Sequence, residues 1–136
     1  MLPASAWIRK SASLSHRKQL GSRAYASGLA AEAASCAALE KDGWTILARR
    51  LRTEAGEIDA VAEKAGLLAI IEVKSRKTLS DAAWSLSARQ RARLLAACSI
   101  LLAENPGWGQ AGVRFDVLLV NEAGKVRRIV DAFRQE

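Results

Sequence analysis

The sequence has 136 residues, half of them hydrophobic, which is enough for one domain with a buried core. No stretch approaches the roughly 18 apolar residues of a membrane span, so we expect a soluble, cytoplasmic protein without a membrane partner. The formal net charge of +7 favours a polyanionic partner, above all nucleic acid, over a protein that is basic for no specific reason.

The basic charge is concentrated at the N-terminus. Residues 1–31 contain five basic residues and no acidic residue, so they carry +5 of the net charge. The first 20 residues lack the apolar run of a secretory signal, and their composition resembles a mitochondrial transit segment only weakly. We therefore interpret residues 1–20 as a disordered basic arm and residues 21–136 as one folded domain.

The scarcity of histidine and cysteine excludes several hydrolase classes. His16 is the only histidine and lies in the basic arm. Cys36 and Cys98 each sit among alanine and leucine residues at helical spacing, which is typical of buried, reduced thiols. The ligands and bases for zinc hydrolysis and for Ser-His-Asp or Cys-His catalysis are therefore missing.

Hydrophobic periodicity predicts two helices. The first is expected over about residues 27–41, or from an earlier start, with Ser27 as a candidate N-cap of its regular part and Asp42-Gly43 as the stop signal. The second is expected over residues 87–104, with an N-cap at Ser87.

Five strands are predicted, and the third is the most apolar. It is interrupted only near its end, at Glu72, which is typical of a central strand buried on both faces. Trp44, Ile46 and Ala48 are expected on one face of the first strand, Trp44 and Phe115 in the core, and the last strand at the sheet edge. The strands are predicted at residues 44–51, 57–63, 67–75, 113–120 and 126–132. The order α-β-β-β-α-β-β predicts an α/β protein of the α+β type, with a mixed central sheet flanked by helices.

The most informative motifs are Gly56-Glu57-Ile58-Asp59 and Glu72-Val73-Lys74, on the second and third predicted strands. Side chains two residues apart on a strand share a face, so Glu72 should lie beside Lys74 and Glu57 beside Asp59. A two-residue connection at positions 65–66 would place Asp59 opposite Glu72, and Glu57 opposite Lys74.

Two carboxylates that face each other on a sheet repel, and burial increases the free-energy cost of keeping both of them charged. Mg²⁺ would remove this repulsion, because it binds one or two carboxylates together with water and substrate phosphate. Lys74 could then hold a phosphate oxygen or lower the pKa of the attacking water. The alternative is an ordinary hairpin with a Glu57–Lys74 ion pair and solvated Asp59 and Glu72.

Several segments together resemble the bacterial YraN family. They are the Gly56–Asp59 motif, Ile71–Arg76, Arg89–Leu94, Gly28–Glu32 followed by Gly43-Trp44, and Arg114–Val117. That family is related by fold to PD-(D/E)XK nucleases, which include archaeal Holliday-junction resolvases and type II restriction enzymes. The resemblance covers about residues 21–133 and implies a restriction-endonuclease-like fold. The chain departs from the family pattern around residues 81–84.

The resemblance also implies roles for individual residues. Asp59 and Glu72 match the ligands of Mg²⁺ or Mn²⁺, and Lys74 matches the catalytic lysine. Glu32 matches an extra acid that faces the metal in resolvase-like members, although it could equally be a solvated helix residue. Gln90 matches a polar residue of the second helix that either orients the substrate or caps the arginine-rich face. Glu57 has no catalytic counterpart.

Basic residues near these motifs could bind phosphates. Arg76 and Lys77 follow the Lys74 strand, and Arg89 and Arg93 share one face of the second predicted helix, whereas Arg91 points elsewhere. The alternative is a solvated charged surface.

These observations lead to three hypotheses. The first is a metal-dependent endonuclease that acts on DNA, including branched or structured DNA; a junction-cutting version would need two active sites and hence a homodimer. The second is a nucleic-acid-binding protein that keeps the nuclease fold without cutting. The third is a structural or protein-interaction module with incidental positive charge.

Overall fold

The computed structural model describes residues 19–80 and 84–134, and side chains from residue 28 onward. Most of the predicted basic arm and the departure at residues 81–83 lie outside these ranges. The described elements are α2 (Gln19–Lys41), β1 (Thr45–Thr53), β2 (Gly56–Lys64), β3 (Leu67–Ser75), α3 (Ala88–Glu104), β4 (Gly112–Val120) and β5 (Val126–Phe133). Their order, α-β-β-β-α-β-β, is the predicted one. No helix in the described ranges is long and apolar enough to cross a membrane.

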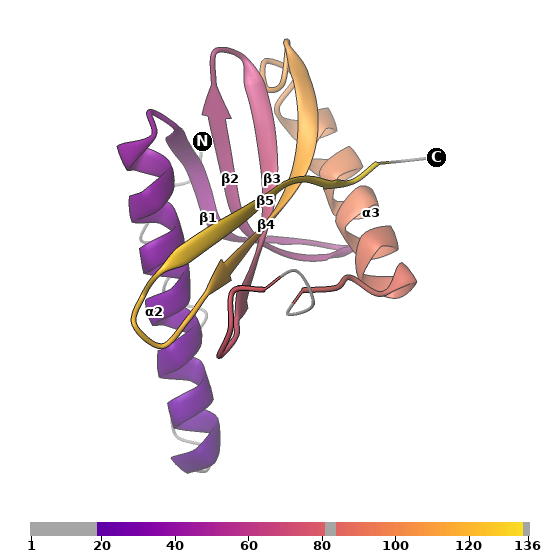
Figure 1. The fold of residues 1–136 in the computed structure, drawn as a ribbon. Helices are drawn as coiled ribbons and strands as arrows, with labels where there is room; N and C mark the ends of the chain where they lie inside the picture. The colour runs from indigo at the N-terminus through magenta and orange to yellow at the C-terminus, as the bar shows by residue number, and fades with distance from the viewer. Residues whose placement is uncertain (1–18, 81–83, 135–136) are drawn as a thin grey trace.

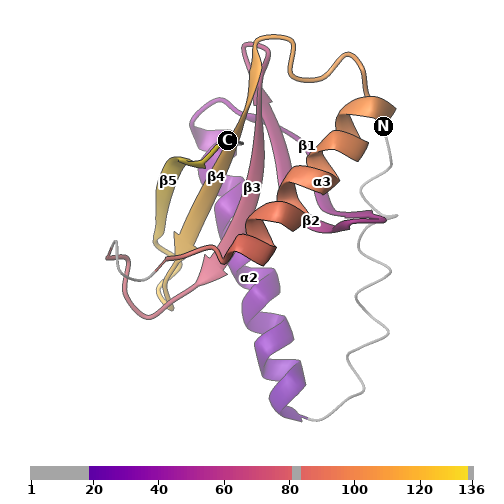
Figure 2. The same ribbon diagram turned by 90° about the vertical axis from the view of Figure 1, so that its right-hand side faces the viewer.

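One five-stranded mixed sheet forms the centre of the molecule, with the strands in the order β1-β2-β3-β4-β5. β3 and β4 are parallel and are connected through α3, while the other neighbours are antiparallel. Helices α2 and α3 lie on opposite faces of the sheet (Figures 1 and 2). β3 is central and β5 is an edge strand, so both predictions are confirmed.

Helix α2 has the earlier of the two predicted starts. The helix begins at Gln19 and runs through Ser27 and Gly28, so Ser27 is not an N-cap. Serine and glycine each lower helix stability by only about 0.5–1 kcal/mol relative to alanine, which the surrounding alanines and the packing against the sheet offset. The predicted end at Lys41 is confirmed.

The hairpin between β2 and β3 has the predicted register. Lys64 pairs with Leu67, and the ladder continues to the pair Ala60 and Ile71. The connecting residues Ala65 and Gly66 both have positive φ, 51° and 81°, as a tight two-residue hairpin turn requires. The two sequence motifs are therefore brought together at the far end of this hairpin.

A β-bulge in β1 overturns one expectation. The register shifts between Ile46 and Ala48, so these residues do not share a face. Trp44 and Ile46 pack with the α2-side core, whereas Ala48 belongs to the α3-side core. Trp44 and Phe115 are both buried, as predicted.

A second irregularity lies at Asp59. Ile58 packs in the α3-side core and Ala60 in the α2-side core, although they are only two residues apart. Arg50, at the matching position of β1, has φ of 51°. The assumption of unbroken alternation, which placed Glu57 and Asp59 on one face, is therefore wrong. Beyond this kink the β1–β2 hairpin bends toward α3 (Figures 1 and 2).

Asp116 on β4 has a structural role. Its fully buried carboxylate accepts two hydrogen bonds from Arg114, each 2.9 Å, and one from the backbone N–H of Asp131 on β5. The guanidinium groups of Arg114 and Arg128 each lie 5.4 Å from the ring of Trp44. This cluster joins β4 and β5 to the start of β1.

Candidate active site

Asp59 and Glu72 lie together just beyond the last regular pair of the β2–β3 ladder. Oδ2 of Asp59 accepts a hydrogen bond of 2.8 Å from the backbone N–H of Val73. Burial raises the pKa of Asp59 from its ordinary value of 3.8 to about 8, and repulsion from Glu72 and a hydrogen bond with it add to the shift. Glu32 also raises this pKa, while the Val73 N–H lowers it. The predicted juxtaposition of the two carboxyl groups is thus present in the structure.

Glu72 also contacts a cation from the second helix. Its Oε2 accepts a hydrogen bond of 3.0 Å from Nη2 of Arg93 on α3. The Glu72 carboxylate is nearly buried, so this guanidinium supplies charge compensation that water cannot. The contact joins two segments that the sequence could not place together.

Lys74 follows Glu72 by two residues on β3. Leu68 and Ile70 of this strand pack in the α3-side core, so the alternation continues through Glu72 to Lys74 on that same face. Lys74 is partly exposed.

Glu32 on α2 completes the acidic side of the site. Its Oε1 lies 3.5 Å from Nε of Arg50, which in turn lies 3.9 Å from Oε1 of Glu57. Burial raises the pKa of Glu32, while Arg50 partly offsets the effect. Arg52 also contacts Glu57, at 3.8 Å. Glu57 therefore pairs with Arg50 and Arg52 of β1, and not with Lys74 as in the ordinary-hairpin alternative.

Arg50 was not among the site residues predicted from the sequence. Its only signal was the run of basic residues Arg49, Arg50 and Arg52 at the end of a strand. The positive φ of Arg50, 51°, arises where β1 pairs with β2, and no local sequence pattern reveals it.

Gln90 caps α3. Its Oε1 accepts a hydrogen bond of 2.9 Å from the Ser87 N–H, and its own N–H donates to Oγ of Ser87 at 3.1 Å. This reciprocal pair is a capping box, which stabilises the start of the helix. The N-cap prediction at Ser87 is confirmed, and Gln90 takes part in the cap, while its role toward a substrate stays a prediction.

The predicted phosphate-binding residues lie in three places. Arg76 and Lys77 border a pocket of about 250 Å³ between the end of β3, the β4–β5 loop and α2. Arg89 is exposed on α3, whereas Arg93 on the same helix turns inward to Glu72. Arg91 points to the other flank of α3, as predicted.

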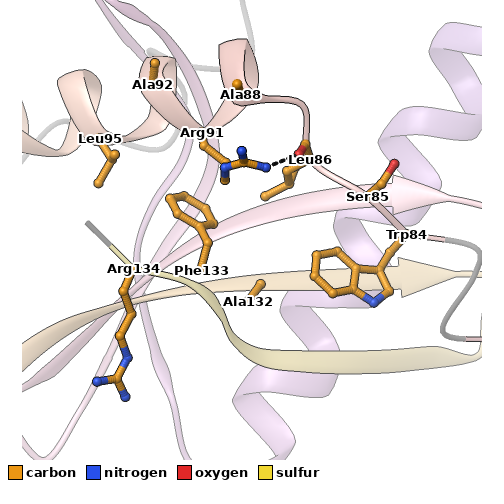
Figure 3. Close-up of a pocket in the computed structure, with 10 residues that line it drawn as sticks. All are labelled: Trp84, Ser85, Leu86, Ala88, Arg91, Ala92, Leu95, Ala132, Phe133 and Arg134. Carbon is orange, nitrogen blue, oxygen red and sulfur yellow. Dashed lines mark hydrogen bonds between the residues drawn. The ribbon is translucent and has the colours of Figure 1, made fainter. Parts of the chain in front are cut away.

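That other flank contains a pocket of about 650 Å³ between α3, the preceding loop and β5 (Figure 3). Arg91 donates a hydrogen bond to the backbone carbonyl of Leu86 at its rim, and Trp84 and Phe133 contribute aromatic rings. Because Arg91 and Arg93 project from opposite sides of the helix, this pocket is separate from the carboxyl pair.

The donors at the site match a hard divalent cation. Asp59 and Glu72 offer carboxylate oxygens, the ligands that Mg²⁺ and Mn²⁺ prefer. Within residues 19–80 and 84–134, no three His, Cys, Asp or Glu side chains are arranged to hold a metal ion. In this arrangement Arg93 contacts Glu72 and Arg50 contacts Glu32.

The model of the uncharacterised protein family UPF0102 matches residues 31–120, about two thirds of the chain. This chain belongs to the UPF0102 family. The match spans Glu32, Asp59, Glu72, Lys74 and Gln90. UPF0102 is the YraN family, so the match confirms the resemblance that the sequence motifs indicated.

Relatives in this family are similar over most of their length. A UPF0102 protein of Granulibacter bethesdensis is 61% identical over 114 residues, which cover 84% of this chain and 72% of the relative. One from Azorhizobium caulinodans is 46% identical, over 83% of this chain and 86% of the relative. One from Acidiphilium cryptum is 48% identical, over 69% of this chain and 73% of the relative.

Proposed function

We propose that this protein is a metal-dependent endonuclease that hydrolyses phosphodiester bonds in DNA. The observation that carries the proposal is the buried Asp59–Glu72 pair with Lys74 beside it. A pKa of about 8 for Asp59 means that the site holds a proton where a cation would be more favourable. Buried structural carboxylates usually avoid such a shift by pairing with a cation, as Glu72 does with Arg93, or by facing water.

The residues would share the work as follows. Asp59 and Glu72 would hold Mg²⁺ or Mn²⁺, which when bound supplies Lewis-acid polarisation of the phosphate and activation of water. The Val73 N–H donates to Oδ2 of Asp59, and the Asp59 carboxyl group also shares a hydrogen bond with Glu72. Lys74 would hold a non-bridging phosphate oxygen by its charge.

DNA is the proposed substrate because the chain is strongly basic. Arg76 and Lys77 after β3 and Arg89 on α3 are exposed on elements that also carry the site. They supply phosphate contacts that orient a duplex without reading its sequence. Cleavage of branched DNA is the narrower form of the proposal, and it requires a homodimer with two sites.

The test is a cleavage assay with Mg²⁺ or Mn²⁺ on duplex, single-stranded and four-way-junction DNA. D59N and E72Q keep the side-chain shape but remove the charge, and we expect each to lower the cleavage rate by about 10³-fold or more, the size of an essential electrostatic contribution. K74M should retain metal binding yet cut poorly. The matched control, E40Q, removes an exposed acid at the far end of α2 and should cut normally. Cleavage that persists in D59N and E72Q would place the activity elsewhere.

A second candidate is DNA binding without cleavage. It is favoured by the Arg93–Glu72 contact, in which a guanidinium already neutralises one of the two carboxylates. Salt-sensitive DNA binding that is unchanged by Mg²⁺ or Mn²⁺, together with no heat of Mn²⁺ binding in calorimetry, would support this function and exclude the first.

A further inference from the structure

We propose that Arg93 is a built-in counter-ion, which holds Glu72 in the metal-free protein and competes with the divalent cation for that carboxylate. The inference rests on the proposed metal site at Asp59 and Glu72. Arg93 is then a positioning residue: it holds the Glu72 carboxylate before a cation binds and becomes available to substrate afterwards.

The first argument is the unequal exposure of the two partners. The Arg93 side chain is 37% exposed, whereas the Glu72 side chain is 11% exposed. The guanidinium can therefore withdraw into solvent at little cost, while Glu72 cannot leave the interior. A cation that arrives at Asp59 and Glu72 repels Arg93 and also removes the charge that holds it.

The second argument is the form of the contact. One nitrogen of Arg93, Nη2, meets one oxygen of Glu72. Within the described part of the chain, Nε of Arg93 is buried and has no hydrogen-bond partner. The guanidinium thus lacks the two parallel bonds of a full arginine–carboxylate pair, which is the stronger arrangement. A single bond of this kind is suited to displacement.

The third argument is that the hairpin backbone makes room for this arginine. A Cβ atom at Gly56 would lie 2.6 Å from Cδ and 2.8 Å from Cγ of Arg93, closer than side chains tolerate. The φ of Gly56 is +138°, which also disfavours any other residue. The absence of a side chain at Gly56 therefore leaves space for the Arg93 stem. Through Arg93, the Gly56–Asp59 motif is connected to Glu72 of the second motif.

The experiment measures Mn²⁺ affinity by isothermal titration calorimetry. R93M keeps much of the stem and removes the charge, so we expect Mn²⁺ to bind about fivefold to tenfold more tightly, as expected when one competing ion pair is removed. G56A pushes the stem away and should act in the same direction. R93K keeps a charge and should lie between the wild type and R93M. The control R134M removes an exposed arginine just after the edge strand β5, outside the proposed phosphate contacts, and should leave the affinity unchanged.

Thermal unfolding gives a second readout. In EDTA, R93M should lower the Tm because Glu72 loses its counter-ion, and saturating Mn²⁺ should restore it to the wild-type value. Equal or weaker Mn²⁺ binding by R93M and G56A, with Mn²⁺ still bound by the wild type, would overturn this inference alone. Absence of Mn²⁺ binding by the wild type and by both variants would overturn the metal site as well.

Discussion

At the scale of single residues, Asp59 departs furthest from ordinary behaviour. Its pKa is raised to about 8 because it is buried beside Glu72, and the Val73 N–H offsets only part of that effect. The metal-free protein therefore keeps a proton on Asp59 at neutral pH. A divalent cation would replace that proton, so the same burial that makes the site costly when empty favours metal binding.

The raised pKa predicts how stability depends on pH. The folded state holds a proton on Asp59 that the unfolded chain releases above about its ordinary pKa of 3.8. This contribution to the free energy of unfolding is complete below that value and disappears as pH rises through about 8. In EDTA, the Tm of the wild type should fall between these limits more steeply than that of D59N. Thermal scans across this range test the prediction, with E40Q as control. Parallel curves for the wild type and D59N would contradict it.

The residues of the site were predictable where they lie on one hairpin. Asp59, Glu72 and Lys74 follow from strand alternation and a two-residue turn, both of which are local properties. The contacts of Glu72 with Arg93 and of Glu32 with Arg50 join separate elements. No spacing rule reports such contacts, because they depend on how α2 and α3 pack on the sheet.

At the scale of elements, the order of helices and strands along the chain and the two-residue hairpin turn were predictable from the sequence. The irregularities within the strands were not. The bulge between Ile46 and Ala48 and the kink at Arg50 and Asp59 arise from pairing across strands. These irregularities matter for the site. The kink turns the end of the β1–β2 hairpin toward α3, which brings Gly56 onto the Arg93 stem.

The capping box at the start of α3 leads to a prediction for Gln90. If capping is its function, Q90E should retain stability, because glutamate is an equivalent partner for Ser87. Q90A should lose about 0.5–1 kcal/mol of unfolding free energy, and S87A about 1 kcal/mol. Urea unfolding measures these differences. DNA cleavage by Q90E at the wild-type rate would agree with capping alone, whereas cleavage lost in a stable Q90E would assign Gln90 to the substrate.

At the scale of the whole molecule, each helix contributes one charged residue to the candidate site from its own face of the sheet. α2 covers one face of the sheet and carries Glu32, while α3 covers the other and carries Arg93 (Figures 1 and 2). Asp59 and Glu72 lie between these contributions at the end of the β2–β3 ladder. The architecture itself followed from the order of the elements, since a helix between two strands predicts a parallel crossover.

The distribution of charge over the molecule gives the last prediction. The basic residues Arg76 and Lys77 follow the end of β3 that carries Lys74. Lys64 lies at the opposite, turn end of the β2–β3 hairpin, and Lys41 is the last residue of α2. If Arg76 and Lys77 bind phosphates, R76Q/K77Q should reduce the slope of log K against log salt concentration by about 2, close to one for each phosphate that is no longer neutralised. K41Q/K64Q removes the same charge and should lower DNA affinity only slightly, with the slope unchanged. Fluorescence anisotropy on a duplex in EDTA, where metal-dependent cleavage cannot interfere, measures both slopes. Equal slopes for the two double variants would mean that the charge acts through long-range attraction, without a defined phosphate-binding surface beside the site.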